Sequence, residues 1–387
     1  MYITKPKSYF KLIESARNLF STKWYETVSV AEICRNAGLS NGIFYRYFKN
    51  KKELFLKLLN EIVTYYEKSF SSITGGTFDE RLDKFLNVVV STGVGDYKKD
   101  ILIYREGQYR FPKYEHHLRD LYAMGISNVF KRETTQAEQL FVSGIVRFVT
   151  IRYIFNSLAY NKENLKKLIV EGIFEEDIKD FNSIFDNKNI VYPEFFDDDS
   201  TKSKLINSGI KLFGEKGFHK TDIHDISKNA GYSVGTFYLY FNSKETFLSE
   251  IVELIGKRTR RFLSINLNKD LNRAENEIRG IYLFLKYFEE NPEFYEIVRE
   301  SEFVIRKTAN EYYNAFERGY INNLKNIKLR DKKLVANSLM GISHYTGIEK
   351  IFLKRMDNEK TILKELSHYL NNGISIWGTL EMKIFKK

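Results

Sequence analysis

Two short segments of this chain carry the side chains best suited to reading double-stranded DNA. The first runs over residues 41–47 and the second over residues 234–240. Arg46 could read guanine through two hydrogen bonds, and Asn41 could read adenine. Leu239 and Val234 offer only apolar contact, for example to a thymine methyl group. The groove-facing candidates are Asn41, Ile43, Tyr45, Arg46 and Tyr47 in the first segment, and Val234, Thr236, Tyr238, Leu239 and Tyr240 in the second.

Further residues around these segments are candidates for backbone contacts with DNA. Gly42 and Gly235 would let the main chain approach a phosphate or a base edge closely. Lys51 and Lys244 open the next predicted helix, where a cation can meet a phosphate. The remaining candidates are Ser29, Ser40, Thr221 and Ser233. Arg46 could also lie over a phosphate, and Lys5 and Lys7 are either a minor-groove arm or a disordered tip.

These segments are two copies of one sequence. Residues 11–51 align with residues 204–244 without a gap, at an offset of 193, and 18 of the 41 positions are identical. A period near half of the 387 residues indicates a duplicated domain rather than a solenoid unit. The motif Arg-Glu-x-x-aromatic recurs at 105–109 and 299–303, so the duplication extends beyond the segments that could read DNA.

Each copy begins with the sequence pattern of a helix-turn-helix. Apolar residues recur at three- and four-residue steps from Leu12 onward, which predicts a first helix. Ser29 with Glu32, and Asp222 with Asp225, are spaced as a capping box that opens a second helix. That helix is expected to end at Gly38 or Gly231 in a left-handed turn. Ser40 or Ser233 would then cap a short third helix, whose Phe44 and Phe48, or Phe237 and Phe241, should face the core.

The spacing of apolar residues predicts helices in the rest of each copy too, so the predicted fold class is all-α. We call the predicted helix-turn-helix DNA-binding domain of each copy its head. The heads are predicted at 1–57 and 201–250, and each is followed by a helical domain, at 58–190 and 251–387. A linker with the acidic run Asp197–Asp199 is predicted at 191–200. The heads differ in charge: residues 1–57 hold 11 Lys and Arg against 4 Asp and Glu, while residues 201–250 hold 7 against 5. The first head should supply more phosphate affinity.

The composition is compatible with this interpretation. The net charge of +11 suggests a polyanionic partner. No apolar run is long enough to cross a bilayer, the N-terminus lacks a signal peptide, and the single Cys34 fits a reducing compartment, so a cytoplasmic protein is expected.

The run A-G-x-S-x-G-x-F-Y-x-Y-F-x-[NS]-K, present at 37–51 and 230–244, resembles the TetR/AcrR family of bacterial transcriptional regulators. The resemblance covers about 50 residues in each copy. It implies an all-α fold, a homodimer of subunits of 190–200 residues, and a four-helix bundle made by the last two helices of two subunits. It also implies repression that a small molecule relieves. This chain fuses two such subunits.

The fusion predicts a single-chain pseudo-dimer. Predicted helices at 138–156 and 162–180 would bundle with those at 331–352 and 358–385. The alternative is that each chain also pairs with a second chain, which would give four heads. A protein–protein module or antirepressor that kept the fold but lost DNA binding is the rival function, because the second head is unusually apolar.

Aromatic residues predict where an effector would bind. The candidates are Tyr104, Arg105, Tyr109 and Phe111 in the first copy, and Phe288, Phe294, Arg299 and Phe303 in the second, whose wider aromatic set includes Phe284 and Tyr295. A lipophilic molecule or a cation held by aromatic faces would suit them. Arg105–Glu106 and Arg299–Glu300 could instead be structural pairs near the heads. No metal or cofactor is expected, and no HExxH, GxSxG or Walker-type motif suggests an enzyme.

Overall fold

The computed structural model describes residues 6–95, 97–155, 157–193 and 199–374. Lys5, Asp197 and Asp198 lie outside the described residues, as does the end of the helix predicted at 358–385. The described chain is helical, and its single β-like feature is an isolated antiparallel bridge between Phe174 and Ile327. None of its helices is long and apolar enough to span a bilayer. The predicted all-α class is confirmed.

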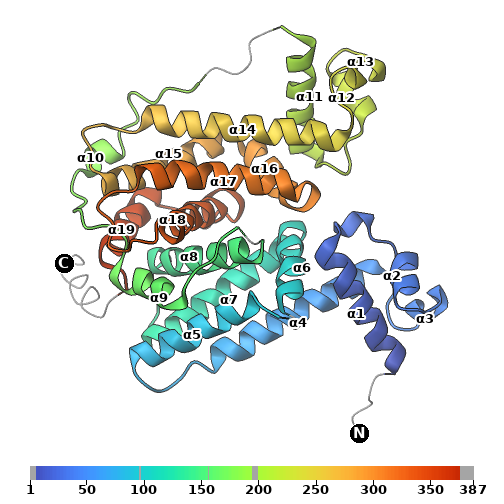
Figure 1. Ribbon diagram of the computed structural model, residues 1–387, viewed down its shortest axis with the longest axis horizontal. Coiled ribbons are helices and arrows are strands. Elements are labelled where there is room, and N and C mark those ends of the chain that lie inside the picture. The colour runs from blue at the N-terminus through green and yellow to red at the C-terminus, as the bar shows by residue number, and fades with distance from the viewer. Residues whose placement is uncertain (1–5, 96, 156, 194–198, 375–387) are drawn as a thin grey trace. The chain divides into compact units, whose positions relative to one another are not determined.

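Two compact units, residues 1–133 and 134–387, account for the chain (Figure 1). This division does not coincide with the repeat. The last helices of the first copy, α8 (Gln136–Ile154) and α9 (Lys162–Glu171), belong to the unit that contains the whole second copy. The reason is packing, because α8 lies along α18 (Lys332–Gly347) and α19 (Glu359–Asn372).

The first unit holds the first head and four helices of its helical domain. The head comprises α1 (Lys7–Thr22), α2 (Val30–Asn36) and α3 (Asn41–Tyr45). The domain comprises α4 (Lys51–Ser71), α5 (Phe78–Thr92), α6 (Tyr97–Arg110) and α7 (Pro112–Phe130). Leu12, Ile33 and Phe44 are fully buried in the head, as their helical spacing predicts.

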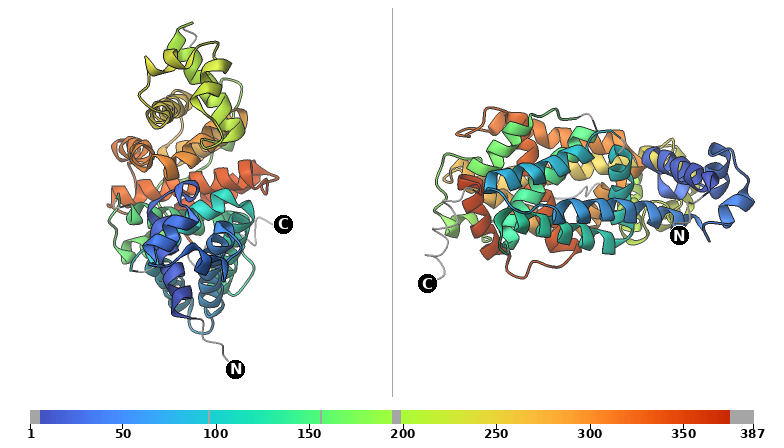
Figure 2. Two further views of the ribbon diagram at one scale, coloured as in Figure 1. Left: turned by 90° about the vertical axis from the view of Figure 1, so that its right-hand side faces the viewer. Right: turned by 90° about the horizontal axis from the view of Figure 1, so that it is seen from below.

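The second unit repeats this order after α8, α9 and the short α10 (Phe181–Ile184). Its head comprises α11 (Thr201–Lys216), α12 (Ile223–Asn229) and α13 (Val234–Tyr238). Its domain comprises α14 (Lys244–Asn266), α15 (Arg273–Glu290), α16 (Pro292–Val304), α17 (Arg306–Asn323), α18 and α19. A π-helical turn, Ile348–Phe352, continues α18. In each copy one long helix, α4 or α14, leads from the head into the helical domain (Figures 1 and 2).

Two boundaries differ from the sequence expectation. The helix predicted at 162–180 ends at Glu171, because Gly172 takes a left-handed backbone (φ 83°) that stops it. The predicted linker begins as ordered chain rather than as free spacer. Asn266 on α14 donates to the Val191 carbonyl at 2.8 Å and accepts from the Val191 amide at 2.8 Å.

Candidate functional site

Both heads contain the predicted turn between their second and third helices. Gly38 (φ 66°) and Gly231 (φ 81°) adopt the left-handed conformation, and a Cβ at either position would strain the backbone. Ser29 and Asp222 cap α2 and α12 by accepting from the amides of Glu32 and Asp225. The reciprocal half of the box is not made by Glu32, whose carboxylate instead pairs with Lys23 Nζ at 2.5 Å.

The third helices expose most of the side chains predicted to face DNA. Asn41, Gly42, Tyr45 and Arg46 are exposed on or just after α3, while Ile43 is half-buried. Tyr47 is also half-buried, because its hydroxyl bonds Ser8 at 2.7 Å and its ring packs on Tyr9. In the second head, Gly235, Tyr238, Leu239 and Tyr240 are exposed, and Val234 and Thr236 are half-buried.

The third helices of the two heads, with the residue that follows each, differ in the chemistry of their exposed side chains. Leu239, at the position of Arg46, exposes 82% of its surface, more than any other large apolar residue in the described chain. Ser233 accepts from the Thr236 amide and caps α13, as predicted. Ser40 makes no such capping bond, so that prediction is wrong for the first head, and its hydroxyl projects at an exposed helix start.

The two motif lysines have a structural role that we did not expect. Lys51 Nζ donates to the carbonyls of Tyr25 and Val28 at 2.7 and 2.8 Å, and Lys244 Nζ donates to those of Phe218 and Thr221 at 2.8 and 2.7 Å. Each ammonium also lies 4.1 Å from the centre of an aromatic ring. Burial lowers the pKa of both lysines. Both lysines therefore anchor the loop between the first two helices of their head, and the phosphate contact stays a prediction.

Thr221, a predicted DNA contact, is buried inside the second head. Its side chain is 1% exposed, and its hydroxyl donates to the carbonyls of Leu212 and Gly217. A residue buried this completely cannot meet a phosphate. Its hydroxyl instead bonds one carbonyl near the end of α11 and one just beyond it.

A carboxylate from each helical domain holds the same loop of the head. Glu106 on α6 accepts from the Tyr25 amide at 3.0 Å, and Glu300 on α16 accepts from the Phe218 amide at 2.8 Å. Lys51 and Lys244 bind the carbonyls of the same two residues. The structural interpretation of the Arg-Glu pairs is thus correct for the glutamates: they join the heads to the helical domains.

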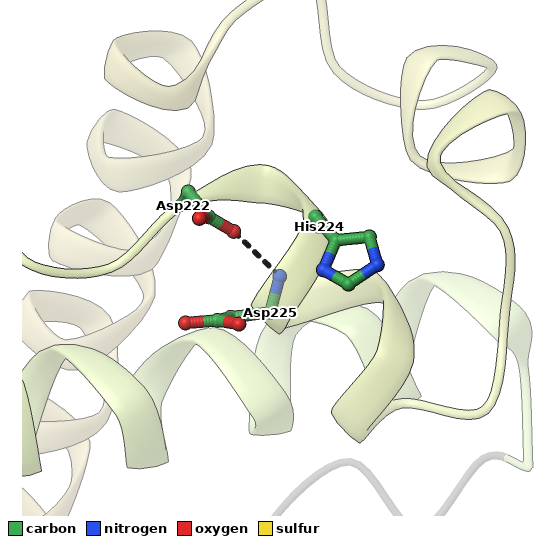
Figure 3. A group of neighbouring side chains, drawn as sticks. All are labelled: Asp222, His224 and Asp225. Atoms are coloured by element: carbon green, nitrogen blue, oxygen red, sulfur yellow. Dashed lines mark hydrogen bonds between the residues drawn. The ribbon is translucent and has the colours of Figure 1, made fainter.

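Three side chains at the start of α12 have the chemistry of a cation site. Asp222, His224 and Asp225 bring ligand atoms within 4.8 Å of one another (Figure 3). Asp222 already accepts from the Asp225 amide at 2.7 Å, and Asp225 pairs with Lys216 Nζ at 3.4 Å. All three residues are exposed or half-buried. The cluster is explained by helix capping and an ion pair, and we assign no metal to it.

The helices that close the second unit make reciprocal contacts between the two copies. Arg147 on α8 stacks over Tyr345 on α18, with the guanidinium 4.0 Å from the ring centre. Arg147 corresponds to His344 in the second copy, and Tyr345 corresponds to Phe148 in the first copy. The reciprocal contact is also made, since the ring of Phe148 on α8 lies 5.8 Å from that of His344 on α18. Contacts that pair i with j and the equivalent of j with the equivalent of i are typical of a two-fold interface.

The main chain shows the same reciprocity at the ends of α9 and α19. Ile173 donates its amide to the Leu370 carbonyl at 2.6 Å, and Ile374 donates to the Ile169 carbonyl at 2.9 Å. Between them Gly172 and Gly373 lie so close that neither has room for a Cβ. Helices α8 and α9 therefore pack against α18 and α19, as predicted for segments 138–156, 162–180, 331–352 and 358–385, although the second segment is helical only to Glu171.

A cavity lies inside the second helical domain. The space between its lining residues is about 580 Å³ when the adjoining open solvent is included, and α14 to α18 and one residue of α8 line it. Lining residues include Gly280, Phe284, Tyr295, Phe316, Tyr320 and His344. Tyr295 donates to the His344 carbonyl at 2.8 Å. Phe284 and Tyr295 belong to the wider aromatic set of the second copy from which an effector site was predicted.

The individual effector candidates lie elsewhere. Phe288 and Phe294 are core residues, Arg299 stacks over Phe352, and neither these nor Phe303 line this cavity. In the first copy, the Tyr104 hydroxyl donates to the Tyr114 carbonyl at 2.8 Å, and Arg105 is buried. Tyr109 lies against Trp24, and Phe111 against Phe55. Sequence reasoning also missed Gly280, because a cavity-lining glycine has no side chain to signal it.

Two heads of this geometry define a helix-turn-helix DNA-binding protein built twice in one chain. The family model described as "Bacterial regulatory proteins, tetR family" matches residues 12–58 and 205–251. Both heads are thus matched to the TetR family, as two DNA-binding domains in tandem.

Several Bacillus subtilis regulators are similar to parts of the chain. HTH-type transcriptional regulator YdgC is 26% identical over 191 residues, which cover 45% of this chain and 92% of YdgC. YuxN is 44% identical over 62 residues, covering 16% of this chain and 20% of YuxN. The chain spans only a fifth to about a quarter of YuxN, YerO and YvdT.

A relative and a solved structure carry more specific names. The negative transcriptional regulator IcaR of the Staphylococcus aureus biofilm operon icaADBC is 30% identical over 87 residues, covering 22% of this chain and 45% of IcaR. The structure of FadR from Bacillus subtilis in complex with stearoyl-CoA is 21% identical, with a TM-score of 0.38, and the match covers 44% of this chain and 98% of FadR.

Proposed function

We propose that this chain is a sequence-specific transcriptional repressor that acts in the cytoplasm as a single-chain pseudo-dimer on an asymmetric operator. The observation that carries the proposal is the reciprocal packing of α8 and α9 on α18 and α19. The resemblance to the TetR family implies that the equivalent helices join two separate subunits. Here one chain supplies both sets, so one chain can supply both heads.

The asymmetry of the operator follows from the reading helices. The first head presents Arg46 and Asn41, which suit hydrogen bonds to base edges, while the second presents Leu239 and Val234, which suit apolar contacts. Identical half-sites would place one of these sets against the wrong base edges. Two unlike half-sites satisfy both heads.

Control by a small molecule is supported by the position of the cavity. Tyr295 and Val298 on α16 line the cavity, and Glu300 on the same helix holds the Phe218 amide of the second head. A ligand that shifts α16 would therefore act on the loop that supports α12 and α13. Repression, rather than activation, is favoured by the family resemblance and by the relative named as a negative regulator.

Selection of binding sites from random duplex DNA, followed by sequencing, tests this function. The proposal expects two unlike half-sites in each selected sequence, and retention on DNA that falls as salt rises. A palindrome of a single half-site would contradict it, because chains would then pair through one active head. The mass of the protein–DNA complex separates one chain per operator from a homodimer with four heads.

One observation favours a second candidate, a protein–protein module or antirepressor. The 82% exposure of Leu239 beside exposed Tyr238 and Tyr240 gives the second head an apolar tip. Such a tip could dock on another protein rather than on DNA. If the selection returns no enriched sequence and no salt-dependent binding, this alternative replaces the repressor.

A further inference from the structure

The first copy fills the space that the second copy leaves as a cavity. Helices α5 and α15 begin with the same capping box, made by Thr77 with Glu80 and by Asn272 with Glu275. Eight residues after the cap, α5 has Phe85 and α15 has Gly280. The two helices can therefore be compared position by position.

Phe85 is fully buried, and its ring stacks on that of Phe70 with 5.2 Å between the ring centres. Gly280 lines the cavity, and a Cβ built on it would meet no other atom within 4 Å. The cavity thus lies at the position that an aromatic ring occupies in the first copy. The second copy has no ring at this point to fill the space.

A second pair of positions shows the same difference. In the first copy, Phe70 on α4 packs against Gly125 on α7, where an added Cβ would lie 2.9 Å from the ring. The equivalent residues in the second copy, at offsets of 193 and 194, are Leu263 and Gly319. Leu263, a smaller side chain than Phe70, lines the cavity, whereas Gly319 is exposed to solvent and does not line it.

We propose that the described part of the chain has one effector site, the cavity beside Gly280 in the second copy, and that the described residues of the first helical domain form a packed scaffold without an equivalent site. For its regulatory meaning this inference rests on the proposed function. The assignment of the binding site depends only on two packing differences between the copies. Gly280 replaces Phe85 at one position, and Leu263 replaces Phe70 at the other.

The lining also defines the chemistry of the ligand. None of the lining residues is Lys, Arg, Asp or Glu. The tyrosine hydroxyls have partners within the protein: Tyr313 donates to Glu302 at 2.5 Å and Tyr320 donates to Glu277 at 2.9 Å. Ring faces and edges remain for the ligand. A charged molecule would lose its hydration without gaining an ion pair, so the site fits a neutral, mainly aromatic molecule.

Binding of a neutral aromatic dye to the full chain tests the site. Titration with N-phenyl-1-naphthylamine, followed by fluorescence, is expected to saturate at one dye per chain. An aromatic cation, tetraphenylphosphonium, should not displace the dye. Two dyes per chain, no saturable binding, or efficient displacement by the cation would each overturn the proposal. These measurements need no variant to fold and no DNA to be present.

Variants at Gly280 locate the bound dye. Gly280→Phe restores the ring that the first copy has, and should weaken dye binding at least tenfold. Gly280→Ala is the matched control, because its Cβ has open space and alanine favours the helix, so it should bind the dye within about twofold of the parent chain. Equal binding by Gly280→Phe and Gly280→Ala, with both melting cooperatively, would place the dye elsewhere and overturn the assignment.

A separate measurement distinguishes this inference from the proposed function. Release of the selected operator is followed as the dye is added. Saturable binding of one dye that leaves the operator bound would support the site and contradict effector control by this class of molecule. Operator release that persists in Gly280→Phe would contradict the site and leave the repressor function standing.

Discussion

Gly144 and Gly341 face each other where α8 crosses α18, and neither position has room for a side chain. A Cβ on Gly144 would lie 3.0 Å from the Ile342 Cα, and a Cβ on Gly341 would collide with the Gly144 carbonyl and the Phe148 Cβ. The two copies therefore meet backbone to backbone at equivalent residues. This close approach is the central contact of the proposed pseudo-dimer.

Gly341→Ala should lower the free energy of unfolding by about 1–3 kcal/mol, because the added methyl overpacks the crossing. Denaturant unfolding followed by circular dichroism measures it. The matched control is Gly319→Ala, on the exposed face of α17, where nothing lies within 4 Å of the new Cβ. There the same change should stabilise by up to about 1 kcal/mol. The same sign for both variants would contradict the crossing.

Arg152 joins the copies through a buried polar network. It is 1% exposed and donates to Asn310, Asn314, Asn337 and Glu317. Arg152→Met should destabilise by about 3–5 kcal/mol, because Glu317 loses a buried partner. The change should show in the same unfolding assay.

The double variant Arg152→Met with Glu317→Gln is its control. Removing the second charge should recover part of the loss, because an amide costs less to bury unpaired than a carboxylate. Strictly additive losses would mean that the two residues do not interact.

Lys244 and Glu300 hold the carbonyl and the amide of Phe218 from opposite sides. Lys244→Met should lower stability by about 2–3 kcal/mol, because it removes charge-assisted bonds to buried carbonyls. It should leave the slope of DNA affinity against salt unchanged once the protein is folded. A slope reduced by about 0.9 would instead identify Lys244 as a phosphate contact.

Glu300→Gln is the companion variant, since its amide oxygen can still accept from Phe218. It should melt close to the parent chain, whereas Glu300→Ala should be less stable by about 1–3 kcal/mol. If both variants melt alike, the carboxylate does not support the head.

The two heads should respond separately to substitution. Arg46→Ala is expected to relax sequence preference at one position of one half-site, at a cost of about 1–3 kcal/mol. Leu239→Ala should weaken only the other half-site. Binding to operators mutated base by base measures both effects. A uniform loss across all positions with Arg46→Ala would mean that Arg46 contacts a phosphate.

The sequence determined the elements that local chemistry controls. The repeat, the left-handed glycines at 38 and 231, the caps at Ser29 and Asp222 and the buried Phe44 and Phe237 all follow from spacing and backbone preference, which act over a few residues. The pairing of the last two helices of each copy was implied by the resemblance to the TetR family.

Only the tertiary structure decided which polar groups meet across long separations. Lys51 was predicted to meet a phosphate, and its hydrogen bonds to two carbonyls more than 20 residues away were not foreseen. Thr221 looked available to DNA until its hydroxyl was seen bonded inside the head. The cavity depends on what surrounds Gly280, a residue without a side chain. Such relationships are set by packing between helices distant in sequence, which local spacing does not encode.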